Sequence, residues 1–166
     1  MQLTLEKVET KDQVASLAQM AGEIWHEYYI RIISKEQIDY MVEKFQSVPA
    51  ITQQMESDGY EYYFLNAGGT NVGYVGVKPE QDKLFLSKFY VLQAQRGNGY
   101  ASQAMTLLVD MCKQRGLRAI WLTVNRHNDS TIAVYEKKGF KTVRTQVADI
   151  GGGFVMDDNI MEKTLV

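Results

Sequence analysis

Residues 96–102, with the sequence RGNGYAS, have the types and spacing that most clearly suggest chemistry. Gly97 and Gly99 follow an arginine and come directly before a stretch with helical periodicity. Glycine has no Cβ and adopts positive φ angles, so a phosphate can approach the backbone N–H groups closely. The start of a helix adds unpaired N–H groups and the positive end of its dipole. The loop therefore indicates a phosphate-binding site, although two glycines can also form an ordinary turn.

Two common phosphate-binding motifs do not match this loop. The sequence contains no G-x-x-x-x-G-K-[ST], which disfavours a nucleoside-triphosphate P-loop. Ser102 stands where a dinucleotide fingerprint has Gly or Ala, and the next apolar stretch ends at Val124 and Asn125 without an acidic residue for a ribose. Neither a kinase nor an NAD enzyme fits this pattern.

The elements that precede the loop follow from hydrophobic periodicity. Residues 2–8 alternate in polarity, as a strand does. Three helices are expected next, marked by apolar residues at helical spacing between positions 14 and 28, a cap at Ser34 with Gln37 at the capping-box position, and Pro49 in a first turn. Strands are then expected at residues 60–67, 71–78 and 83–92, and their short connections predict an antiparallel meander.

The elements that follow the loop complete one α/β unit. A helix begins at the loop and ends at Gly116, a buried strand covers residues 117–124, and a second helix covers residues 129–139. Two closing strands are joined through DIGGG. The expected order is β-ααα-βββ-α-β-α-ββ, in a single domain over residues 1–166.

Two motifs in this order resemble one enzyme family. R-x-x-G-x-A at residues 96–101 is similar to the acetyl-CoA pyrophosphate loop, Q/R-x-x-G-x-G/A, of the GCN5-related N-acetyltransferase (GNAT) superfamily. The later segment NRHNDSTIAVYEKKGF resembles a second family motif through Asn128, Tyr135, Lys137, Gly139 and Phe140. The resemblance implies the GNAT fold, α/β (α+β), with a mixed, mostly antiparallel, twisted sheet of about seven strands flanked by helices.

The resemblance also implies how acetyl-CoA (coenzyme A) is held. In the family, backbone amides of the loop grip the pyrophosphate, and the matching residues here are Arg96, Gly97, Asn98, Gly99, Tyr100, Ala101 and Ser102. The preceding strand, at Phe89, Tyr90 and Val91, would hydrogen-bond the pantetheine as an added strand does, in a V opened by splaying from AIWLTV. Asn128 and Lys137 are further expected contacts, and Asn128 can also cap the helix that follows it.

Tyr135 is the expected general acid, because the family places a tyrosine next to the coenzyme A sulfur. A phenol with a pKa near 10 can protonate a departing thiolate; the alternative is a packing residue on an amphipathic helix. The general base is not identified, because LFLSKFYV lacks the glutamate that many relatives carry on this strand. An ordered-water relay is the default, with His26, Glu27 and Asp157 as candidate side chains.

The acceptor site is expected on the early helices, which form the acceptor wall in this family. The segment EIWHEYY supplies Trp25, Glu27, Tyr28 and Tyr29, and aromatic faces with a carboxylate suit an ammonium group. Trp25 and Tyr28 can equally be core residues. Together with Asp157 and Asp158 in DIGGGFVMDDNIMEK, this segment resembles the bacterial spermidine/spermine N-acetyltransferase-like branch, so a polyamine, drawn by carboxylates, is a candidate acceptor.

Composition excludes several other partners. The chain has 18 Lys+Arg and 20 Asp+Glu, a net charge of −2, so neither nucleic acid nor an anionic membrane is expected as a partner. The start MQLTLEKVETKDQ lacks signal-peptide features, and a cytoplasmic location is expected. Cys112 is the single cysteine, so we expect no metal site and interpret it as a buried structural thiol rather than a nucleophile. Dimers are frequent in the family, and the exposed edge of the last strand is where a homodimer would pair.

These features indicate an acetyl-CoA-dependent N-acetyltransferase that transfers the acetyl group directly to a primary amine of a small molecule. A non-catalytic acyl-CoA sensor with the same fold is the alternative from another class. Transfer to a protein N-terminus or a lysine side chain would differ only in the acceptor.

Overall fold

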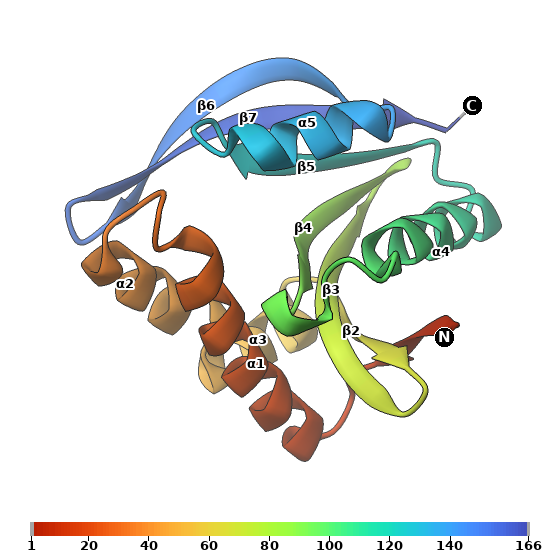
Figure 1. The fold of residues 1–166 in the computed structure, drawn as a ribbon, viewed down its shortest axis with the longest axis horizontal. Helices are drawn as coiled ribbons and strands as arrows, with labels where there is room; N and C mark the ends of the chain where they lie inside the picture. The colour runs from red at the N-terminus through yellow and green to blue at the C-terminus, as the bar shows by residue number, and fades with distance from the viewer. Residues whose placement is uncertain (1, 166) are drawn as a thin grey trace.

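A seven-stranded sheet in the order β1-β2-β3-β4-β5-β7-β6 organises the molecule (Figure 1). The computed structural model describes residues 2–165. The elements are β1 (Leu3–Lys7), α1 (Lys11–Tyr29), α2 (Lys35–Gln46), α3 (Val48–Ser57), β2 (Glu61–Ala67), β3 (Thr70–Glu80), β4 (Lys83–Val91), η1 (Gln93–Gln95), α4 (Tyr100–Gln114), β5 (Ala119–Asn125), α5 (Asp129–Lys137), β6 (Lys141–Gly151) and β7 (Phe154–Thr164). The order of helices and strands expected from the sequence is confirmed, as is the mixed α/β class.

Most of the α-helices start at a residue whose side chain caps the first backbone N–H groups. Thr10 caps α1 in a full capping box with Gln13, Ser34 caps α2, and Ser47 caps α3, whose first turn contains the expected proline. Gln37 differs from the expectation, because its side-chain amide donates to the carbonyl of Val155 at 2.8 Å. The residue at the capping-box position of α2 therefore ties that helix to β7.

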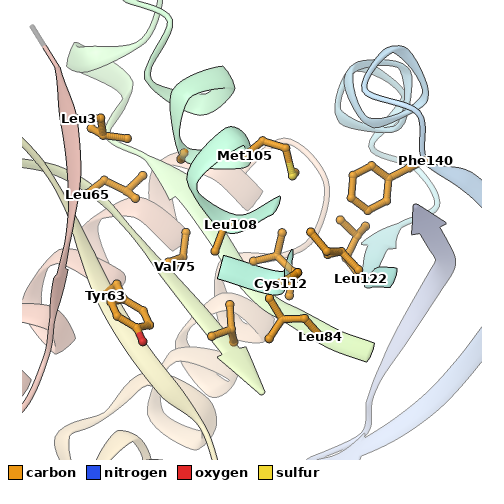
Figure 2. Close-up of a cluster of buried hydrophobic side chains, with 14 of the residues drawn as sticks. Leu3, Tyr63, Leu65, Val75, Leu84, Met105, Leu108, Cys112, Leu122 and Phe140 are labelled. Carbon is orange, nitrogen blue, oxygen red and sulfur yellow. The ribbon is translucent and has the colours of Figure 1, made fainter. Parts of the chain in front are cut away.

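Two hydrophobic clusters cover the two faces of the sheet. Alternation along β2 separates them, since Tyr63 and Leu65 belong to one cluster while Tyr62 and Phe64 belong to the other. Figure 2 shows the first cluster, in which residues of α4 pack against the strands, and the second lies under α1, α2 and α3. Cys112 is fully buried in the first cluster (Figure 2).

The strands β4 and β5 separate soon after they begin. They are parallel and pair only through Lys83, Leu84 and Phe85. On its other side β4 pairs with β3 throughout, but the register shifts so that Ser87 becomes an extra residue, a β-bulge. Figure 1 shows β4 running away from β5, which lies with α5, β6 and β7. The splay leaves one edge of β4 without a strand partner beyond Phe85.

The expected dimer edge needs a correction. The last strand, β7, lies inside the sheet, paired with β5 on one side and β6 on the other. The exposed edge at this end is β6, where Val143 and Val147 are 57% and 66% exposed. The hairpin through residues 149–153 folds back so that β7 enters between its two neighbours. Within residues 2–165, no helix is both long and apolar enough to span a membrane.

Candidate functional site

Two cavities lie where β4 and β5 diverge. The smaller, about 30 Å³, is lined by β4, β5, the end of α1 and the inward side of α5. The larger, about 330 Å³, is lined by residues of α1, α2, α3, β4, β5 and β7. They have in common the lining residues Tyr29, Ser87, Tyr90, Thr123 and Asn125. The splay thus forms a narrow slot that meets a wider chamber at the bulge of β4.

The glycine loop lies at the start of α4. Gly97 and Gly99 have φ angles of 84° and 77°, and Gly99 is the N-cap residue. The helix has no side-chain cap, in contrast to the four other α-helices. A Cβ on either glycine would meet no atom within 4 Å, so the backbone angle rather than crowding requires glycine. The first N–H groups of α4 are therefore available to an anion.

The side chains around this loop take different directions. Arg96 stacks over the ring of Tyr28, 5.6 Å from its centroid, and its Nε lies 3.4 Å from the carbonyl of Val91. Asn98 donates from its amide to the carbonyl of Gln95. Both side chains contact other parts of the protein, so the feature of this loop that could bind an anion is its backbone.

A lysine from α5 reaches the same helix start, but it is not the expected one. Lys137 is exposed, whereas Lys138, the next residue, donates from Nζ to Ser102 Oγ at 2.9 Å. Family-motif spacing selected Lys137, and the direction of a side chain at the end of a short helix cannot be read from spacing. The structure brings Lys138 to the loop and leaves Lys137 away from it.

Tyr135 projects from α5 into the slot. Its ring lies 6.4 Å from that of Phe89 and 5.3 Å from that of Phe140, and it lines the smaller cavity. Among residues 2–165 its hydroxyl has no hydrogen-bond partner. Burial, and to a lesser extent Tyr28 and Tyr29, raises the pKa of this phenol, so it is protonated at neutral pH.

Asn128 performs a structural role beside the slot. It is 7% exposed, its Oδ1 accepts from the backbone N–H of Thr131 as the N-cap of α5, and its Nδ2 donates to Tyr28 Oη at 3.0 Å. Tyr28 Oη also contacts Thr131 Oγ1. Asn128 thus fixes the start of α5 and the end of α1 against each other, and it lines the slot as well.

The aromatic residues expected on the acceptor wall do come together. The hydroxyls of Tyr29 and Tyr90 form a hydrogen bond of 2.8 Å, and each of the two residues lines both cavities. Trp25 lines the larger cavity and donates from Nε1 to Tyr74 Oη at 2.9 Å. Tyr28 lines the slot but not the larger cavity. Phe89 also lines the slot, whereas Val91 lies beyond it toward the loop.

The acidic and basic side chains expected to act on the acceptor lie elsewhere. Glu27 is exposed, outside the lining of both cavities. His26 contacts Asp39 at 2.6 Å on α2, and this hydrogen bond raises the pKa of the histidine. Asp157 pairs with Arg126, Oδ2 to Nε at 3.2 Å, while its buried Oδ1 has no hydrogen-bond partner within residues 2–165. The structure therefore does not bring Glu27 or Asp157 to the larger cavity.

Three charged residues line the larger cavity instead: Asp58 and Lys88, to which the sequence assigned no role, and Asp158, which the sequence grouped with Asp157 as a candidate for attracting a polyamine. Burial lowers the pKa of Lys88 to about 8. Burial, with a smaller contribution from the neighbouring Asp157, raises the pKa of Asp158 to about 6. The signal for Asp158 was present in the Asp-Asp pair, but strand alternation decides which of the two faces the cavity, and the register of β7 is set by its partners.

Comparison with known proteins gives a consistent result. Residues 19–140 match the acetyltransferase (GNAT) family. The uncharacterized N-acetyltransferase YycN of Bacillus subtilis is 33% identical over 70 residues, 41% of this chain and 45% of that protein, so the matched region spans about half of this relative's length. The PaiA N-acetyltransferase of Thermoplasma acidophilum in complex with coenzyme A superposes with a TM-score of 0.78 at 22% identity, covering 99% of each chain. A chimera of the spermidine N-acetyltransferase SpeG from Vibrio cholerae superposes with a TM-score of 0.70 at 18% identity, covering 99% of this chain and 96% of that one.

Proposed function

Because the chain belongs to the GNAT acetyltransferase family, an acetyl-CoA-dependent family, we propose that it transfers an acetyl group directly to the primary amine of a small molecule. The observation that supports this proposal is the meeting of slot and chamber at shared residues on β4 and β5. A donor in the slot and an acceptor in the chamber would come into contact there. We propose further that residues 1–166 act as a single domain.

The residues present fit acetyl-CoA. The uncapped start of α4, with two glycines at positive φ, suits a diphosphate. The unpaired edge of β4 beyond Phe85 suits the amides of a pantetheine arm. Lys138, beside Ser102, adds a positive charge at the same helix start. Acetyl-CoA supplies the acetyl group as a thioester, which an amine attacks only in its neutral form.

Two side chains suit the two proton transfers. Asp158 lines the chamber, and with a pKa of about 6 it is ionised at neutral pH and can accept a proton from the acceptor ammonium. Tyr135 lines the slot, remains protonated, and can donate its proton to the leaving thiolate. The base and the acid thus lie on opposite sides of the junction between the cavities.

A polyamine is the finer candidate acceptor suggested by the sequence. Two carboxylates, Asp58 and Asp158, line the chamber, which favours a cationic molecule. Of the acidic residues on which that prediction relied, Asp158 lines the chamber, whereas Glu27 and Asp157 lie outside it. The similarity to the spermidine enzyme concerns the fold, so the polyamine stays a prediction.

Free-thiol release from acetyl-CoA tests the proposal, with polyamines, monoamines, amino acids and lysine peptides as acceptors. We expect turnover with at least one small amine, and Tyr135→Phe should lower kcat by about 100-fold, the lower part of the range for a general acid, while the Kd of acetyl-CoA stays within about twofold. Tight acetyl-CoA binding without thiol release on any acceptor would favour the non-catalytic sensor. Turnover on peptides alone would favour a protein acceptor.

A further inference from the structure

Lys88 is the basic residue of the acceptor chamber. No other Lys, Arg or His within residues 2–165 lines this cavity. Its Nζ donates to Ser87 Oγ at 2.6 Å and lies 5.9 Å from the centroid of the Trp25 ring. None of the ion pairs formed among residues 2–165 includes it. Because Lys88 is only partly exposed, the chamber contains a partly desolvated ammonium without an ion-pair partner among residues 2–165.

The β-bulge of β4 explains how a lysine comes to line this chamber. The register shift makes Ser87 the extra residue, so Lys88 lies opposite Gly76 of β3. A Cβ on Gly76 would lie 3.2 Å from Lys88 Cγ, so glycine at this position leaves room for the lysine stem. The local backbone thus holds the lysine beside Trp25, at the wall that also carries the shared residue Ser87.

An acid stands in the same chamber, but it does not neutralise the lysine. Asp158 is 9% exposed, and among residues 2–165 no cation lies within ion-pair distance of its carboxylate. Burial alone accounts for the lowered pKa of Lys88, with no contribution from Asp158. The charge of Asp158 instead helps to raise the pKa of Tyr29. The exposed Asp58 also lines this cavity. The cavity therefore carries one cationic and two anionic side chains, and among residues 2–165 Lys88 forms an ion pair with neither carboxylate.

We propose that the acceptor is an amine that also carries an anionic group, which binds Lys88 while the amine lies toward Asp158 at the junction of the cavities. This inference rests on the proposed function and specifies its substrate class. Partial burial of an ion without a partner has a desolvation cost, and a ligand of opposite charge offsets that cost. A chamber of about 330 Å³ is at the small end of ligand sites, which suits a molecule of amino-acid size.

A polyamine carries additional positive charges where the proposed acceptor carries a negative one. Every additional ammonium of a polyamine that enters the chamber would meet Lys88 in surroundings of low dielectric constant, where repulsion is poorly screened. An amino acid and the amine formed by removing its carboxylate differ only in the group proposed to meet this lysine. Such pairs isolate the contribution of Lys88.

The experiment compares kcat/KM for ornithine with putrescine, lysine with cadaverine, and 2-aminoethyl phosphate with ethanolamine. The first two pairs test a carboxylate and the third a phosphate. We expect the wild-type enzyme to prefer the anionic member of at least one pair by about 10- to 100-fold, the effect of a hydrogen bond to a charged group. Lys88→Met should abolish that preference, by lowering kcat/KM for the anionic member and raising it for the diamines that Lys88 repels, and Lys88→Arg should retain part of the preference.

Controls separate this inference from the proposed function. Lys113→Met removes an exposed lysine in the last turn of α4 and should leave every preference unchanged. Calorimetric binding of ornithine and putrescine in the presence of coenzyme A gives a readout without turnover. Ornithine binding that requires Lys88, without thiol release, would support the inference and contradict the proposed function. Turnover of diamines at or above the rate of their amino acids, unchanged in Lys88→Met, would overturn the inference and leave the proposed function intact.

Discussion

Replacing Asp158 with asparagine should make the protein more stable and less active. The carboxylate lies on β7, is 9% exposed, and has no cation within ion-pair distance in the described residues. Its pKa rises from 3.8 to about 6, because burial penalises the charged form and Asp157 repels it. At neutral pH the folded protein therefore carries a charge that the unfolded chain holds more easily.

The magnitude follows from this shift in pKa. A change from 3.8 to about 6 corresponds to about 3 kcal/mol at about 1.36 kcal/mol per pKa unit. Between those two values the native state binds more protons than the unfolded state, so wild-type stability falls as pH rises and the loss is complete above about pH 6. Asp158→Asn removes this loss. We expect it to raise the free energy of unfolding by up to about 3 kcal/mol at pH 8 and about half as much at pH 5.

The assay combines urea denaturation at pH 5 and pH 8 with kcat/KM at pH 8. As the proposed base, Asp158 should contribute about 100-fold or more to kcat/KM, so the stabilised variant should be nearly inactive. Asp110→Asn, on the exposed face of α4, is the matched control and should change neither quantity. A stability difference that is the same at both pH values would refute the proposed charge burial, and full activity would refute the role of Asp158 as base.

Three further predictions concern the cofactor loop and the core. Gly99→Ala places a side chain at a φ of 77° without a steric clash. We expect the free energy of unfolding in urea to fall by about 1–2 kcal/mol, and the Kd of coenzyme A measured by calorimetry to rise at least tenfold. An unchanged Kd would argue against a phosphate at this loop. Lys138→Met should raise the same Kd several-fold, whereas Lys137→Met should not, because of these two lysines Lys138 is the one that contacts Ser102. Equal effects of the two substitutions would contradict the placement of Lys138 at the phosphate site. Cys112 should be alkylated by iodoacetamide at pH 8 far more slowly than free cysteine, since burial raises its pKa to about 11. Mass spectrometry follows the labelling of the native protein, and rapid labelling would show that the thiol is accessible.

Local patterns in the sequence were sufficient to predict the order of elements and the glycine-rich loop before α4. Periodicity located each helix and strand, and residues 97–99 contain the spacing of glycines that a helix start with positive φ angles requires. The capping serine Ser34 and the buried Cys112 also followed from their immediate neighbours. These features depend on residues a few positions apart, so they can be read along the chain.

The acceptor chamber depended on contacts that the chain makes over long distances. Glu27 and Asp157 had suitable chemistry, but an exposed helix face and an ion pair with Arg126 keep them away from the chamber. Lys88 and Asp158 line it because a bulge in β4 and the pairing of β7 between β5 and β6 set the direction of each side chain. One residue of register reverses the face on which a strand side chain lies, and that register is fixed by partner strands rather than by local sequence. The sequence by itself therefore determined the order of the elements and the glycine-rich loop, because both depend on neighbouring residues, whereas only the tertiary structure decided which charged side chains line the proposed acceptor chamber.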